Sequence, residues 1–134
     1  MNADPFNGTW VLLPDQSRLS TPPQQWVQHI VASDERIAVR EDIVSADGIH
    51  EEVTVDAAFD GQPYPVHGSR FADSIAYWRV SDRAIEGMGF RQGALMLEGT
   101  TTVSDAADRL TYAYRIVSGG RELGSGTAVF ARQD

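Results

Sequence analysis

The chain has 134 residues, a formal net charge of −8 and no cysteine. This length fits a single domain spanning residues 1–134, and the acidic charge argues against nucleic acid and anionic membrane surfaces as partners. A disulfide framework and a thiolate metal site are excluded because cysteine is absent. Residues 1–5 lack the pattern of a signal peptide and no stretch has the length of an apolar membrane span, so we expect a cytoplasmic protein.

Short alternating or apolar stretches, each closed by a polar or glycine turn, recur about every eight to twelve residues, which is typical of all-β barrels and sandwiches. The predicted strands span residues 9–13, 25–31, 37–44, 49–59, 63–66, 74–80, 83–90, 94–103, 110–117 and 122–132. Because closure removes exposed strand edges, we expect an antiparallel up-and-down β-barrel of about eight to ten strands with an internal cavity. A sandwich is the alternative.

Two irregular segments interrupt this pattern. In residues 14–24, Pro22 and Pro23 restrict the backbone, so this segment is expected to be a loop with a helical turn or two at most. Proline in the short strand over 63–66 suits an edge or irregular position, and residues 67–73 form the most irregular stretch of the second half.

Clean alternation assigns faces to two of the strands. The side chains of Leu110, Tyr112, Tyr114 and Ile116 share one face, which we expect to point inward. The same rule turns Val53, Val55, Ala57 and Phe59 inward and leaves Glu52, Thr54 and Asp56 in water. Residues 74–80 remain undecided, because Ile75, Tyr77 and Arg79 oppose Ala76, Trp78 and Val80 and each set holds a large ring.

With the Gly8-Thr9-Trp10 opening and ten short strands, the chain resembles the calycins, the lipocalin-like and fatty-acid-binding-protein-like barrels. This resemblance implies a Trp10 indole that closes one end of the barrel beside a basic residue, either Arg132 or Arg115. Small bacterial lipocalin-like proteins are the most similar members, and they imply no established activity.

The chain departs from several calycin families. The loop over 14–24 is too short for the helical lid of fatty-acid-binding proteins, and the glycine-rich opening with Tyr-Pro of haem-binding nitrobindins is absent. An avidin-like set of ring-stacking tryptophans is also missing. We therefore expect no cofactor.

A barrel of this size favours a small-molecule site lined by apolar and aromatic side chains. The candidate ligand-binding residues are Trp26, His29, Tyr64, His67, Tyr77, Trp78, Met88, Phe90, Met96, Tyr112 and Tyr114. Tyr112 and Tyr114 are the best polar members, since each offers a phenol on an inward face.

Histidine is the residue type whose ordinary pKa lies near neutrality. His67, at a strand end before Gly68, is the leading histidine candidate, followed by His29, whereas His50 is expected to be solvated. A triad of His67, Ser69 and Asp73 is disfavoured because three residues on one loop rarely converge.

The remaining titratable groups give weaker signals. The three histidines have no paired metal-ligand spacing, so no metal site is predicted. Glu41 and Asp42, beside Arg40, are interpreted as part of a solvated strand, because adjacent strand residues point to opposite faces.

The sequence thus supports one leading function and two alternatives. The leading hypothesis is a monomeric or homodimeric protein that binds a small hydrophobic or aromatic molecule. The first alternative is a cofactor-independent isomerase, cyclase or lyase in which His67 or His29 moves a proton and a tyrosine, Tyr112, acts as donor. The second is a structural or interaction module with a filled core.

Overall fold

The computed structural model describes residues 4–133 and forms a closed barrel of ten antiparallel strands, which confirms the predicted antiparallel up-and-down barrel. The strands are β1 (Gly8–Leu12), β2 (Gln25–Ala32), β3 (Arg36–Val44), β4 (His50–Ala58), β5 (Tyr64–His67), β6 (Ser74–Ser81), β7 (Ala84–Arg91), β8 (Ala94–Val103), β9 (Arg109–Ser118) and β10 (Arg121–Arg132). Each strand end lies within one residue of its predicted position, because turn residues mark nearly every boundary.

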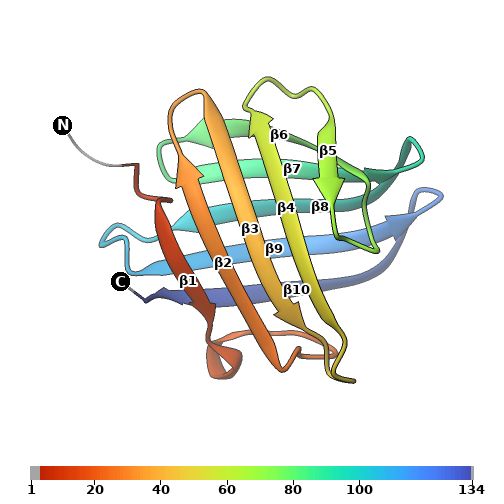
Figure 1. The fold of residues 1–134 in the computed structure, drawn as a ribbon, viewed down its shortest axis with the longest axis horizontal. Helices are drawn as coiled ribbons and strands as arrows, with labels where there is room; N and C mark the ends of the chain where they lie inside the picture. The colour runs from red at the N-terminus through yellow and green to blue at the C-terminus, as the bar shows by residue number, and fades with distance from the viewer. Residues whose placement is uncertain (1–3, 134) are drawn as a thin grey trace.

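Each strand pairs with its neighbour in the chain, and β1 closes the barrel by pairing with β10. Strands β1 to β5 form one layer and β6 to β10 the other, and the strands of the two layers run across each other (Figure 1). The interior between these layers is the space in which a site can form.

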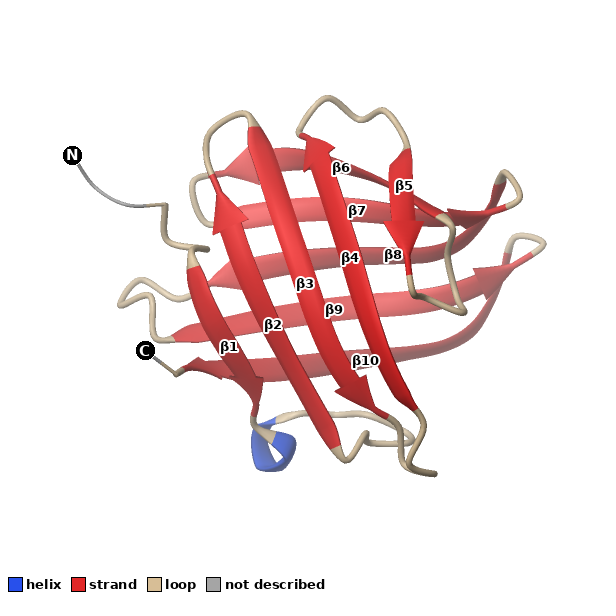
Figure 2. Ribbon diagram, in the orientation of Figure 1, coloured by secondary structure: helices blue, strands red, loops and turns tan. Residues whose placement is uncertain are grey.

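The segment between β1 and β2 contains the single short helix of the described residues, a 3-10 turn over Pro14–Gln16 (Figure 2). Arg18 then pairs with Thr127, so this segment extends the contact with β10 beyond the end of β1. No helix within residues 4–133 is long and apolar enough to cross a membrane.

One end of the barrel is closed by the segment before β1. The side chains of Phe6 and Trp10 are fully buried there, and Trp10 Nε1 donates a hydrogen bond to the Phe6 carbonyl at 3.0 Å. The guanidinium of Arg132 lies 4.3 Å from the centre of the Trp10 ring. The prediction that Arg132 partners Trp10 is confirmed, whereas Arg115 pairs with Glu98.

Arg79 completes this closed end and settles the orientation of β6. Its guanidinium pairs with Asp4 and lies over the rings of Phe59 and Phe6, at 4.9 and 5.4 Å from their centres. Tyr77, two residues earlier on the same face, packs against the core. The set of Ile75, Tyr77 and Arg79 therefore points inward.

Candidate functional site

Four aromatic side chains line the interior of the barrel beyond its closed end. The Trp26 ring meets the Tyr112 ring edge to face, with the ring centres 6.3 Å apart and the planes at 87°. Tyr114 stacks on Tyr112 at 5.1 Å with an interplanar angle of 21°. Tyr77 comes from the opposite side of the barrel, on β6. These rings form an aromatic wall with faces in more than one direction.

Each of the three tyrosines lies against a glycine on a neighbouring strand. A Cβ atom added to Gly87 would lie 3.0 Å from the Tyr77 ring, and one added to Gly99 would lie 2.4 Å from the Tyr112 ring. A Cβ atom on Gly126 would lie 2.7 Å from the Tyr114 hydroxyl oxygen. The glycines let the rings lie back along the inner surface of the sheet, so that they do not project straight across the barrel.

A carboxyl group belongs to the same interior surface. Glu41 follows Ile37 and Val39 at alternate positions of β3, and both of these are buried. Its neighbours across the sheet are Gln28 on β2 and Val53 on β4, which are also buried. Glu41 and Gln28 thus place a carboxyl and an amide side by side on the interior surface.

The interior position changes the acid–base properties of Glu41. Burial raises its pKa to about 7, and the negative charge of Glu51 adds to the rise, while the nearby indole N–H of Trp26 opposes it. Trp26 Nε1 is itself buried and completes no hydrogen bond with a described residue. The carboxyl of Glu41 and the N–H of Trp26 therefore lie near each other inside the barrel.

The phenols around Glu41 stay protonated. Burial raises the pKa of Tyr77 above its usual range, and the charge of Glu41 raises it further. The pKa of Tyr112 is raised by burial, then by Tyr77 and Glu41. Both hydroxyls can donate hydrogen bonds at any physiological pH.

A second interior carboxyl already has a partner. Glu51, on the inward face of β4, accepts a hydrogen bond from Arg70 Nε at 3.1 Å, and its side chain is 14% exposed. Arg70 belongs to the segment between β5 and β6, and its side chain is 49% exposed. No cation pairs in this way with Glu41 among residues 4–133.

The interior surface is not completely covered. Trp26, Glu41, Tyr77 and Tyr112 all point into the barrel, yet each retains an intermediate accessible surface. By contrast, Trp10 and Phe6 at the closed end are fully buried, as is Phe130, whose ring meets that of Trp26 at 5.1 Å. The arrangement offers aromatic faces, one titratable carboxyl and several hydrogen-bond donors to a small molecule.

The structure separates the predicted site residues by face. Trp26, Tyr64, Tyr77, Tyr112 and Tyr114 lie on inward positions, although the Tyr64 hydroxyl donates to Asp60 at 2.7 Å in an exposed setting. The outer-face residues are His29, His67, Trp78 and Met88, while Phe90 and Met96 lie at a register shift between β7 and β8. The interior cluster therefore contains none of the predicted histidines.

His67 pairs with Thr54 of β4, whose neighbours Val53 and Val55 point inward. Its exposed side chain consequently lies on the outer face, away from Tyr112. The predicted proton transfer between these two residues would have to cross the sheet.

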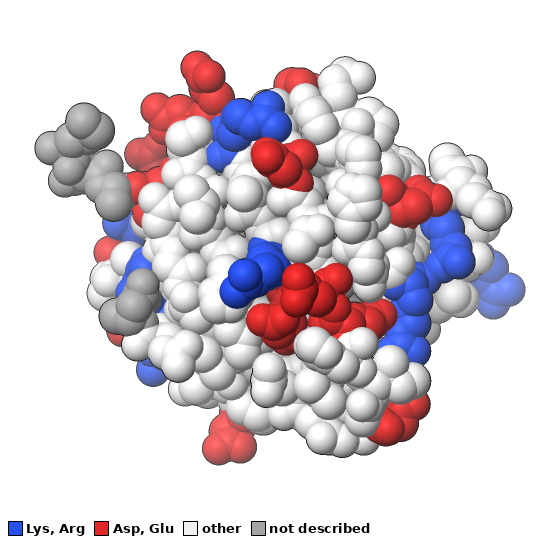
Figure 3. Space-filling model, viewed as in Figure 1, with Lys and Arg blue, Asp and Glu red and all other residues white. Residues whose placement is uncertain are grey.

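His29 belongs to a polar cluster on the outer face of β1 to β4. Its Nδ1 lies 3.1 Å from Thr9 Oγ1, and its Nε2 lies 3.6 Å from Asp42, which also lies 3.9 Å from His50. Figure 3 shows acidic side chains with basic ones between them over this layer. Thr9 and His29 are directly opposite each other, and Asp42 lies diagonally from His29 on β2 and from His50 on β4, so the four residues form cross-strand polar pairs.

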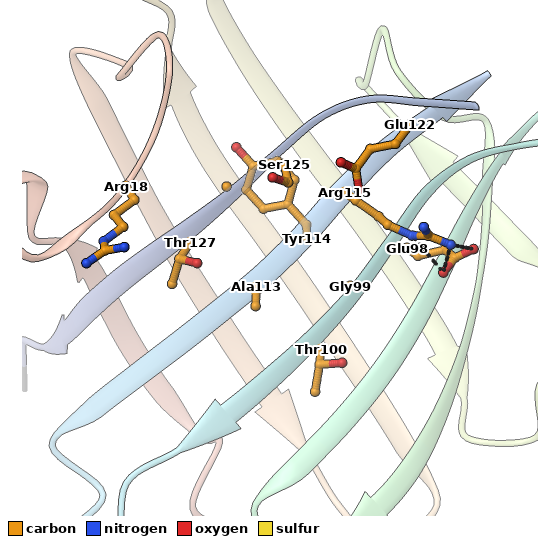
Figure 4. Close-up of a pocket in the computed structure, with 11 residues that line it drawn as sticks. Arg18, Glu98, Gly99, Thr100, Ala113, Tyr114, Arg115, Glu122, Ser125 and Thr127 are labelled. Carbon is orange, nitrogen blue, oxygen red and sulfur yellow. Dashed lines mark hydrogen bonds and ion pairs between the residues drawn. The ribbon is translucent and has the colours of Figure 1, made fainter. Parts of the chain in front are cut away.

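A shallow, open groove of about 530 Å³ lies over β8, β9 and β10 (Figure 4). Its polar lining includes Arg18 and the Arg115–Glu98 ion pair, in which the nitrogen–oxygen distance is 3.1 Å. Gly99 and Gly126 bring this groove close to the interior tyrosines. It lacks the enclosed aromatic surface of the barrel interior.

Glu41 and Gln28 are the interior residues that the sequence analysis missed. The interpretation of Glu41 as part of a solvated strand is wrong, because its carboxyl lies inside the barrel. The alternation of residues along β3 indicates the inward position of Glu41, since Ile37, Val39 and Glu41 occupy every second position.

Comparisons with known proteins agree with the barrel fold. No family model matches the chain, and no curated protein matches it. Among solved structures, the chain is similar to EF1p2_mFAP2b bound to DFHBI, with a TM-score of 0.52 and 12% sequence identity. That likeness covers 96% of this chain and 94% of the other, so it extends over the whole barrel.

Proposed function

We propose that this protein binds a small, largely apolar or aromatic molecule inside the barrel, in the calycin manner. The observation that carries the proposal is the incompletely covered interior surface of Trp26, Tyr77 and Tyr112 around Glu41. Aromatic walls with a few polar groups are the usual form of a small-molecule site.

Two further observations support a site in the interior. The glycines opposite the tyrosines increase the room between the two sheets, and the structural neighbour was solved with DFHBI bound. In addition, Trp10, Arg132 and Arg79 hold one end of the barrel closed, so a ligand would enter from the other end.

The proposal is tested by native mass spectrometry of the purified protein, followed by incubation with a panel of apolar and aromatic compounds. We expect a retained or readily loaded molecule and a change in Trp26 fluorescence on loading. The fluorescence change should be lost in Trp26→Phe, while Trp78→Phe, which alters an outer-face indole bonded to Glu86, should keep it. If the purified protein has the mass of the chain alone and takes up none of the compounds, the proposal is wrong.

A second candidate function, a cofactor-independent enzyme, is favoured by the Glu41 carboxyl. With a pKa raised to about 7, it could both accept and release a proton near neutral pH, and the Tyr77 and Tyr112 phenols could donate hydrogen bonds. Glu41 would then take the role that the sequence analysis gave to His67. Turnover of a bound compound that is lost in Glu41→Gln would distinguish this candidate from binding alone.

A further inference from the structure

We propose that the barrel interior selects ligands that carry an organic cation, held by the Glu41 carboxylate and the faces of the surrounding aromatic rings. This inference rests on the proposed function and names the chemical class of its ligand. It concerns the cluster of Glu41, Trp26, Tyr77 and Tyr112.

The first step concerns charge inside the barrel. Arg70 pairs with Glu51 at 3.1 Å, and Arg79 pairs with Asp4 at the closed end. The Glu41 carboxylate has no such pair among the described residues. A carboxylate in a weakly hydrated site gains most from a cation that is brought to it.

The second step concerns the rings. Trp26 and Tyr112 meet at 87°, so they present surfaces in two directions, and Tyr77 adds a third ring from β6. The electron-rich face of an aromatic ring attracts a cation within about 6 Å, and several such rings around one centre favour ammonium groups. The rings and the carboxylate together fit a ligand in which a positively charged group is attached to an apolar body.

The third step concerns the whole chain. A net charge of −8 makes the protein attract cations from solution and repel anions. An anionic ligand such as a carboxylic acid would also meet Glu41 on the interior surface, whereas the charge of Glu51 is already paired with Arg70. The interior charge therefore favours a cationic ligand over an anionic one.

The pH dependence follows from the groups that face Glu41. These are Glu51 from β4, Tyr77 from β6 and Tyr112 from β9, while β2 contributes the uncharged Trp26 and Gln28. The carboxylate form is depleted below about pH 7. A permanently charged ligand should therefore bind about tenfold more weakly at pH 6 than at pH 8.

The test compares benzyltrimethylammonium with its neutral carbon isostere, neopentylbenzene, by calorimetry and Trp26 fluorescence. We expect the cation to bind wild-type protein at least about tenfold more tightly than the isostere at pH 8. The preference should disappear in Glu41→Gln. It should persist in Glu98→Gln, whose carboxylate lies in the outer groove.

The outcomes separate this inference from the proposed function. If both probes bind equally and Glu41→Gln and pH change nothing, the interior binds small molecules but the cation preference is wrong. If neither probe nor any apolar compound binds, the proposed function fails as well. The comparison between pH 6 and pH 8 uses wild-type protein, so it tests the preference even if Glu41→Gln does not fold.

Discussion

Glu41 shows how the setting of one residue changes what its side chain can do. In water a glutamate is ionised at neutral pH, but burial among Gln28, Val53 and the interior rings raises its pKa to about 7. Near neutrality the group is therefore divided between a carboxyl that donates and a carboxylate that accepts.

The same shift predicts a cost in stability at high pH. Below about pH 4.5, Glu41 is protonated in both the folded and the unfolded chain, so its titration has no effect. As the pH rises toward 7, the unfolded chain ionises first and the free energy of unfolding falls. A pKa shift from 4.5 to about 7 corresponds to about 3 kcal/mol, so the free energy of unfolding should be about 3 kcal/mol lower at pH 8 than at low pH.

Glu41→Gln should remove this dependence, because glutamine does not titrate. We expect urea unfolding to show the variant gaining about 3 kcal/mol over wild type between pH 4 and pH 8. Glu98→Gln, at an exposed ion pair, is the matched control and should follow wild type. Parallel pH profiles for Glu41→Gln and wild type would show that the carboxyl is solvated.

At the scale of the strands, most of the architecture could be predicted from the sequence. Turn residues marked the ends of the ten strands, and alternation correctly placed Tyr112 and Tyr114 on the inward face of β9. The orientation of β6 could not be predicted, because both of its faces carry large rings. Only the contacts of Arg79 with Asp4 and Phe59 decide it.

The site was harder to predict than the strands because it is made by residues on different strands. His67 lies at a strand end, where functional residues are often found, but its pairing with Thr54 directs the His67 side chain to the outer face. Conversely, Glu41 looked like a solvated residue beside Arg40 and Asp42. Its role depends on rings contributed by β2, β6 and β9, which no local pattern reveals.

The connection from β5 to β6 depends on one glycine. Gly68 has a φ of +87°, and a Cβ atom added to it would lie 1.9 Å from the Glu52 carbonyl oxygen of β4. Backbone atoms cannot move aside cheaply, so Gly68→Ala must displace the segment that carries Arg70. The ion pair between Arg70 and Glu51 depends on this segment.

We expect Gly68→Ala to destabilise the protein by about 2 to 4 kcal/mol. Gly61→Ala is the matched control, since Gly61 has a φ of +73° but nothing within 4 Å of an added Cβ atom. Gly61→Ala should lower the free energy of unfolding by only about 1 kcal/mol, the cost of holding alanine at a positive φ. Equal losses in the two variants, measured by urea unfolding, would show that the contact with Glu52 is unimportant.

At the scale of the whole molecule, the barrel is held shut where its first and last strands meet. Arg132, near the end of β10, lies over Trp10 of β1 and donates hydrogen bonds to the carbonyls of Pro5, Asn7 and Ala107. One side chain thus joins the N-terminal segment, the turn between β8 and β9, and the closing strand pair. A planar guanidinium can stack and donate in several directions at once, which an ammonium group cannot do.

Arg132→Lys should therefore weaken the whole barrel, although it keeps the charge. We expect a loss of about 2 to 4 kcal/mol in one cooperative unfolding transition, since three partly buried carbonyls lose their donors and Trp10 loses the stacked guanidinium. Arg115→Lys is the matched control, because the exposed pair of Arg115 with Glu98 contributes at most about 1 kcal/mol. If Arg132→Lys were as mild as Arg115→Lys, strand pairing between β1 and β10 alone would hold the end closed.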